Sequence, residues 1–376
     1  MKRDLKTLTI SLLFWGLGES LFLFFQPIYL QQLGADALEI GTILAIMGFA
    51  LGMAQISTGY LSDRIGVKFI LRTSWVMGTI ATVIMALAPN LSFYIFGMLI
   101  YALTGAVTAP MNSYISSIRG NLSIGQAISI PASGFNLGAI FGPVLGGFIS
   151  QLVGLRAIYW LAFGFFVISS ILAFYLKEKE VFPHDEKEIA QKPWQNKLFN
   201  IFLGLIFFLI FSSYLPIPLT PNFLFNLHNI PLSTLGILGA LSSLGYILLA
   251  FFGSKAKSEI NLIFSVLLMV LFCGLILVGK SILAFAAAYL FASGYRFLRS
   301  MVMAYSHQLV HQNHLGIAYG LIESVAGIAI TLAPLLAGFI FSKDARFIYI
   351  TGMFCLVISM ICTIYFIKKV GVRKIG

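Results

Sequence analysis

The sequence GYLSDRIGVK, from Gly59 to Lys68, lies at the junction of two long apolar segments, residues 38–61 and 69–88. Each segment has about the 20 apolar residues that an α-helix needs to cross a hydrocarbon core about 30 Å thick. The short polar stretch between them predicts a tight loop at a membrane surface. The fold of the whole chain follows from how often this pattern recurs.

The composition of the chain is that of a membrane protein. Of the 376 residues, 59% are hydrophobic and 10% are charged, and the mean hydropathy is +0.95. An ordinary soluble domain carries about 25% charged residues. A water-soluble fold is therefore excluded, because it could not bury so much apolar surface.

Apolar segments recur along the chain and predict twelve transmembrane helices. One long polar segment, 177–197, divides them six and six. We predict an all-α membrane protein with an N-terminal six-helix bundle at 1–176, a cytoplasmic linker at 177–197 and a C-terminal six-helix bundle at 198–376. The predicted spans are 8–30, 38–61, 69–88, 91–117, 125–150, 156–176, 198–225, 231–253, 260–278, 281–305, 315–341 and 346–367.

The two halves resemble copies of one another. Matching residues recur at a fixed offset of about 190 residues through five successive spans, which predicts two pseudo-symmetric repeats, an arrangement found in transporters. At an offset of 191 the pairs include Pro27 with Pro218, Gly48 with Gly239, Tyr114 with Tyr305, Pro143 with Pro334, and Gly147 with Gly338.

The net charge of +11 is a topology signal. Of the 24 Lys and Arg residues, 18 fall in segments that would share one side of the membrane. By the positive-inside rule, that side is the cytoplasm. We expect a multi-pass protein of the cell membrane with both termini cytoplasmic, whose environment is the lipid bilayer and which has no nucleic-acid partner.

The loop at 59–68 resembles the signature G-x-L-x-D-R-x-G-R-K of the major facilitator superfamily. Its place between the second and third of twelve spans is that of the signature. The resemblance implies alternating-access transport, and a gate in which Asp63 interacts with the N-terminal end of span 11 while Arg64 and Lys68 add ion pairs. A simple positively charged anchor is the alternative. The matching residues are Gly59, Leu61, Asp63, Arg64, Gly66 and Lys68.

Span 5 contains GAIFGPVLGG, which resembles the antiporter motif of the same superfamily. The resemblance favours proton-coupled efflux. The alternative is ordinary packing of small residues, since glycines four residues apart allow two helices to approach closely. The matching residues are Gly138, Gly142, Pro143, Gly146 and Gly147.

One departure from the resemblance puts the coupling ion in question. Drug/proton antiporters of the superfamily often have an arginine in span 4, about four residues before a glycine. Counting back from Gly105 gives Tyr101 here. This chain therefore has no arginine at that position to tune proton binding.

Glu19 is the leading candidate for a proton or cation site. It lies about twelve residues into span 1, or about 18 Å deep at 1.5 Å per residue, and shares a helical stripe with Trp15, Phe22 and Gln26. A charged side chain at the centre of a span costs about 2.5–3.5 kcal/mol, so a functional role is the first hypothesis. The resemblance implies that spans 1, 4, 7 and 10 line a central cavity. A hydrogen-bonded structural glutamate is the alternative.

Three more charged residues fall inside the predicted spans. Arg296 could bind an anion or pair with a buried glutamate. For Arg299 we expect an extension toward the cytoplasmic boundary, and for Glu323 either pairing or direct ligand contact. The repeat partners of Glu19, Arg296 and Glu323 are uncharged, so duplication does not explain these charges.

Other polar residues are weaker candidates. Asn112, Tyr214, Asn222 and Asn226 are plausible lining residues in spans 4 and 7. No metal-ligand spacing, phosphate-binding loop or nucleophile–base motif is present, so we expect neither an enzyme nor a cofactor. The leading hypothesis is a secondary transporter, active as a monomer, that couples efflux of a lipophilic drug or small metabolite to a proton gradient. The alternative is uptake or exchange of a small organic anion recognised by Arg296.

Overall fold

The computed structural model describes residues 3–176, 195–253, 256–310 and 315–375. Within them, the side chains of residues 56–65, 109, 124–125, 315–316 and 371–375 are not described. All regular secondary structure in these ranges is helical. The predicted all-α fold is confirmed.

The helices of the N-terminal half follow the predicted spans closely. They are α1 (Arg3–Leu23), α2 (Gln26–Gln32), α3 (Ala37–Ile65), α4 (Val67–Leu87), α5 (Leu91–Thr104), the 3₁₀ turn η1 (Gly105–Val107), α6 (Thr108–Ile118), α7 (Ile124–Val153) and α8 (Leu155–Phe174). Those of the C-terminal half are α9 (Lys197–Tyr214), α10 (Thr220–Leu227), α11 (Leu232–Gly253), α12 (Ser258–Val278), α13 (Ile282–Ala292), α14 (Gly294–Ser306), α15 (Leu315–Lys343) and α16 (Phe347–Ile375).

The contacts between residues divide the chain into two compact units. The first contains the described residues of Met1–Ala35, Ile46–His184 and Leu224–Ala240, and the second those of Asp36–Ala45, Asp185–Phe223 and Leu241–Gly376. Compared with the predicted halves 1–176 and 198–376, two short segments, 36–45 and 224–240, are exchanged.

Ten helical segments of the described chain are long and apolar enough to cross a membrane, and an eleventh results if α1 and α2 form one bent span. The predicted span 281–305 is the exception, because it is divided at Ser293 into α13 and α14. Neither helix alone has the length of a span, and α14 carries both Arg296 and Arg299.

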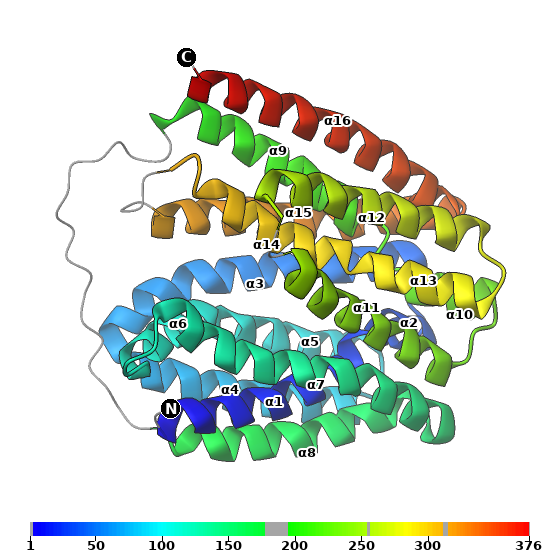
Figure 1. Cartoon of the computed structure of the whole chain (residues 1–376). Helices are drawn as coiled ribbons and strands as arrows, with labels where there is room; N and C mark the ends of the chain where they lie inside the picture. The colour runs from blue at the N-terminus through cyan, green and yellow to red at the C-terminus, as the bar shows by residue number, and fades with distance from the viewer. Residues whose placement is uncertain (1–2, 177–194, 254–255, 311–314, 376) are drawn as a thin grey trace. The chain divides into compact units, whose positions relative to one another are not determined.

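In the first unit, α1 packs against α7 and α8, and α4 packs against α5 and α8 (Figure 1). Small residues make the first contact close. A Cβ atom at Gly134 would lie 2.5 Å from the carbonyl oxygen of Thr9, and one at Gly146 would lie 2.6 Å from that of Leu21. Glycines at every fourth position of α7 therefore let the backbones of α1 and α7 touch.

A buried hydrogen-bond network connects three helices of this unit. The Trp75 indole of α4 donates to Ser11 Oγ of α1 at 3.0 Å and to Ser169 Oγ of α8 at 2.8 Å. All three side chains are buried. Since a buried polar group without a partner is destabilising, this network fixes how α4 sits on the α1–α8 pair.

The second unit repeats the same scheme with the equivalent helices. The helix α9, which corresponds to α1 in the repeat, packs against α15 and α16, and α12 packs against α13 and α16 (Figure 1). These pairs correspond one for one to α1 with α7 and α8, and to α4 with α5 and α8. The duplication inferred from the sequence is therefore matched by a duplicated packing pattern.

The close α1–α7 contact predicts an asymmetric response to two glycine substitutions. A Cβ atom at Gly138 would overlap the backbone of Leu13 and Leu17, whereas one at Gly164 of α8 would meet nothing within 4 Å. We expect Gly138→Ala to lower the free energy of unfolding by about 1–3 kcal/mol and Gly164→Ala to leave it nearly unchanged. Thermal unfolding of the purified protein in detergent measures both, and equal melting temperatures would contradict the packing.

Candidate functional site

Four of the twelve predicted spans are interrupted, and they are spans 1, 4, 7 and 10. The first bends by 42° between α1 and α2, and η1 interrupts the second between α5 and α6. The chain between α9 and α10 contains Pro216 and Pro218, which have no amide hydrogen. The fourth break is at Ser293.

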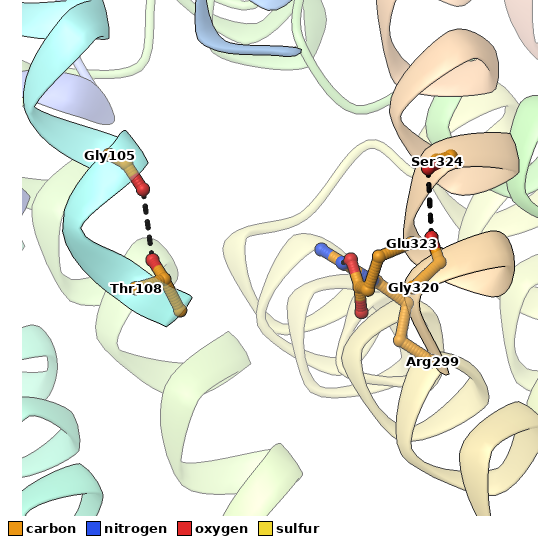
Figure 2. A network of polar contacts seen from close by, with 6 residues as sticks. All are labelled: Gly105, Thr108, Arg299, Gly320, Glu323 and Ser324. Atoms are coloured by element: carbon orange, nitrogen blue, oxygen red, sulfur yellow. Dashed lines mark hydrogen bonds and ion pairs between the residues drawn. The ribbon is translucent and has the colours of Figure 1, made fainter. Parts of the chain in front are cut away.

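Hydroxyl side chains compensate three of these breaks. Thr108 Oγ1 donates to the Gly105 carbonyl oxygen at 2.9 Å, as Figure 2 shows. Thr220 Oγ1 donates to the carbonyl oxygen of Pro216 at 2.6 Å, and Ser293 Oγ donates to that of Leu290. Irregular backbone at membrane depth is tolerated where protein or water satisfies its polar groups. The broken spans are therefore where a solute-binding site is physically easiest to build.

Glu19 of α1 lies in an aromatic cluster of the first unit. It is half-buried, and the Tyr101 hydroxyl of α5 lies beside its carboxyl group. The Tyr101 ring is parallel to that of Trp15 within 14°, at a centroid distance of 6.4 Å, and the Phe22 ring meets its edge at 5.0 Å. A carboxyl group on an interrupted span thus lies beside a hydroxyl group and a cluster of aromatic rings.

Tyr101 is a candidate that sequence reasoning missed. It entered that analysis only as the residue standing where relatives have an arginine. In the structure Tyr101 lies in the last turn of α5, just before η1, and its side chain is beside Glu19 of α1. Spacing in the sequence did not reveal this contact, because it depends on how two separate helices pack.

Trp15 and Gln26 have mainly packing roles in the described structure. The Trp15 ring stacks on Phe166 at 4.2 Å and contacts Trp75 at 5.2 Å. Gln26 is buried in α2 beside Tyr94, whose hydroxyl hydrogen-bonds to that of Tyr159. The stripe predicted for span 1 is therefore divided, with Glu19 half-buried and Gln26 in a closed polar cluster.

In the second unit, Arg296 of α14 is directed at α11. Its Nη1 atom donates to Ser243 Oγ at 3.3 Å, and its guanidinium lies 5.7 Å from the centroid of the Tyr246 ring. The side chain is half-buried. A guanidinium with a hydroxyl and an aromatic face beside it can bind an anion or a polarisable ring.

Arg299 forms an ion pair with Glu323 of α15, and Figure 2 shows the two side chains pointing at one another. The expected extension of Arg299 toward the cytoplasmic boundary stays a prediction, and the ion pair is a contact that the sequence did not specify. The Tyr295 hydroxyl lies beside Arg299, and the Tyr295 ring lies 5.2 Å from that of Tyr214. Glu323 thus has a partner on α14, which is Arg299 and not Arg296.

The surroundings of Asn112 and Asn226, two of the weaker candidates, differ. Asn112 of α6 is half-buried, and its carbonyl oxygen accepts from Ser116 at 2.9 Å. In α15, the Ser324 hydroxyl beside Glu323 donates to the Gly320 carbonyl oxygen (Figure 2). Asn226 donates to Gln31 Oε1 at 2.9 Å, so it connects α10 with α2 within the first unit.

The predicted gate is described in part. Gly59, Asp63 and Arg64 are in the part of α3 whose side chains are not described. Lys68 is half-buried at the start of α4. Gly66 precedes α4 with φ of +85°, a conformation that favours glycine. The tight turn expected at Gly66 is confirmed.

The motif glycines of α7 face two different neighbours. Gly138, Gly142 and Gly146 face the backbone of α1, with Gly142 against Ser20. A Cβ atom at Gly147 would lie 2.5 Å from the carbonyl oxygen of Leu232 in α11. Pro143 lies inside α7 without ending the helix. The motif is thus built into helix packing on two sides.

Comparison with known proteins gives the chain its relatives. The model of a family described as Major Facilitator Superfamily matches residues 8–217. An MFS-type transporter of Methanocaldococcus jannaschii is 33% identical over 168 residues, which are 43% of this chain and 42% of that protein. The multidrug resistance protein MdtG of Salmonella typhi is 27% identical over 193 residues, or 50% and 48% of the two chains. The chain thus matches about half the length of these relatives.

Two solved structures are similar over the whole chain. The crystal structure of the nucleoside transporter NupG superposes with a TM-score of 0.80 at 14% identity, covering 98% of this chain and 100% of that one. A bacterial homologue of the human lysosomal transporter Spinster gives 0.69 at 15% identity, covering 98% and 94%. At such low identity these likenesses show the fold alone.

The contact between Tyr101 and Glu19 predicts how a carboxyl reagent will react. Tyr101→Phe keeps the ring packing and removes the hydroxyl, so we expect the free energy of unfolding to fall by no more than about 1.5 kcal/mol. Labelling of Glu19 by dicyclohexylcarbodiimide should rise, because the carboxyl group loses a neighbouring hydroxyl that can donate to it. Mass spectrometry of the labelled peptide measures this. Tyr365→Phe, at a tyrosine that is 68% exposed on α16, is the control, and equal labelling in both variants would contradict the contact.

Proposed function

The chain belongs to the major facilitator superfamily, and from this premise we propose that it is a proton-coupled exporter of lipophilic drugs or small metabolites that works by alternating access. Its family and fold are those of membrane transporters. The observation that carries the proposal is Glu19, which is half-buried among aromatic rings beside Tyr101. It lies in span 1, which is interrupted between α1 and α2.

Glu19 is the proposed proton site for three physical reasons. A carboxyl group can release and take up a proton, and the Tyr101 hydroxyl can bond to either form. A charged group inside a span is costly, so a carboxyl group retained there points to a function. The part-buried Trp15 ring offers apolar surface to a lipophilic substrate and can attract a cation, and the buried rings of Phe22 and Tyr101 pack beside it.

The direction of transport rests on two further observations. The antiporter-like glycine motif of α7 is complete, and the similar protein MdtG is named for multidrug resistance. Both support export. The distribution of Lys and Arg supports an orientation with the two termini in the cytoplasm, and one chain contains both repeats, which supports a functional monomer.

The loop at 59–68 is the proposed cytoplasmic gate. Asp63, Arg64 and Lys68 would form breakable ion pairs there, and the positive φ of Gly66 sets the turn between α3 and α4. We expect Asp63→Asn to slow transport without abolishing substrate binding, because a gate acts on the conformational change. Initial rates and binding affinity, measured on the same preparation, test this. Loss of binding with an unchanged turnover rate would contradict the gate.

A second candidate function is uptake or exchange of a small organic anion. The observation that favours it is Arg296, whose guanidinium has Ser243 and the Tyr246 ring beside it. Flux of cationic dyes and of organic anions in parallel separates the two functions. If Arg296→Gln leaves dye export intact and wild type moves no organic anion, only the first function remains.

The decisive experiment measures proton-coupled flux in proteoliposomes. With an imposed pH gradient, we expect the wild-type chain to move ethidium against its concentration gradient and to move protons in the opposite direction. Glu19→Gln should abolish both movements, because the amide cannot carry a proton. Glu39→Gln is the matched control, since Glu39 is an exposed residue in the first turn of α3 that contacts only its own loop in the described hydrogen bonds. Coupled flux that persists in Glu19→Gln would refute the assignment.

A further inference from the structure

The ion pair of Arg299 and Glu323 has no role in the function proposed above. Its side chains are 36% and 47% exposed, although Glu323 lies inside the apolar segment Ile317–Lys343. A charged pair exposed to acyl chains would carry the full insertion penalty of a charge in a span. This cost favours an arrangement in which the exposed faces of these two side chains meet water, where solutes could reach them.

The exposure makes the pair exchangeable. Exposed ion pairs are weak, because water competes for both partners. The guanidinium of Arg299, in contrast, is charged at every physiological pH, and an anion nearby stabilises it at membrane depth. An external carboxylate can therefore replace Glu323 at small free-energy cost.

The surroundings of Arg299 define what such a ligand looks like. The Tyr295 hydroxyl lies beside the guanidinium. The rings of Tyr295 and Tyr214 lie 5.2 Å apart and are inclined by 35°, so apolar ring surface lies next to the charge. The remaining donors of the guanidinium match the two oxygens of a carboxylate.

We propose that Arg299 binds the carboxylate of a ring-bearing organic acid in place of Glu323, with Tyr295 and Tyr214 beside the ring. This rests on the proposed transport function and names a substrate class for it. It differs from the anion hypothesis for Arg296, because Arg296 faces Ser243 and Tyr246 and the described structure pairs Glu323 with Arg299. In this arrangement Glu323 is an internal stand-in for the carboxylate of the substrate.

The test is a binding experiment on the purified full chain in detergent, without any gradient. Phenylacetate is the probe, and phenylacetamide, which has the same shape but no charge, is its control. We expect phenylacetate to raise the melting temperature and phenylacetamide to leave it unchanged. Glu323→Gln should bind phenylacetate about two- to fivefold more tightly, the factor that the loss of a weak exposed competitor allows. A purely structural pair predicts weaker binding or none in this variant.

Arg299→Gln should lose binding, and Arg299→Lys, which keeps the charge but loses the two-point geometry, should weaken it. Ser324→Ala is the matched control for Glu323→Gln, because Ser324 donates only to its own helix in the described hydrogen bonds. If Arg299→Gln does not fold, Glu323→Gln and Arg299→Lys still decide the matter.

Three results would overturn the proposal. The first is equal binding of phenylacetate and phenylacetamide. The second is the absence of phenylacetate binding in both the wild type and Glu323→Gln. The third is loss of binding in Arg296→Gln while Arg299→Lys binds normally. A failure of the proton-coupled function is distinguishable, because it would remove gradient-driven flux in proteoliposomes and leave phenylacetate binding in detergent intact.

Discussion

The constraint on which the structure depends is that backbone amides and carbonyls inside a bilayer must find partners within the protein. It explains why the described chain is built of helices, and why most predicted spans are single uninterrupted ones. It also gives meaning to the exceptions. Spans 1, 4, 7 and 10 break, and Thr108, Thr220 and Ser293 supply hydroxyl donors to nearby carbonyl oxygens at three of the breaks.

The charged residues inside the predicted spans lie on these interrupted spans or pair with one of them. Glu19 lies on α1, and Arg296 and Arg299 lie on α14, immediately after the break in span 10. Glu323 is on an unbroken helix but pairs with α14. Each repeat contributes the same helix-packing scheme, whereas the charges have no counterpart in the other repeat. Duplication thus built a common scaffold, and unequal substitutions placed a carboxyl group among rings in one unit and a guanidinium pair in the other.

The glycine motif of α7 shows how one sequence pattern can have two explanations at once. The resemblance connects it with antiport, and the structure connects it with packing, since Gly138 and Gly142 face α1 while Gly147 faces α11. The two explanations are compatible, because helices that pack through bare backbone can slide or rock without dragging side chains past each other. The sequence alone favoured antiport through the resemblance, and it did not show the packing partners, because spacing does not say which neighbour a helix face meets.

Hydrophobic periodicity, loop length and charge asymmetry determined the fold class, most of the long helices, the repeat and the tight turn at Gly66, because lipid imposes these features segment by segment along the chain. Twelve spans were predicted, whereas the described chain has ten long apolar helices, or eleven with the bent α1–α2 pair. The prediction was incomplete where the environment of a residue depends on another helix. It treated Tyr101 as a missing arginine, assigned Gln26 to the same stripe as Glu19, and named no partner for Arg299. Only the tertiary structure brought Tyr101 to Glu19, closed Gln26 against Tyr94, and paired Arg299 with Glu323. The physical reason is that insertion into lipid is a local property of about 20 residues, whereas the partner of a buried polar group is decided by how separate helices pack.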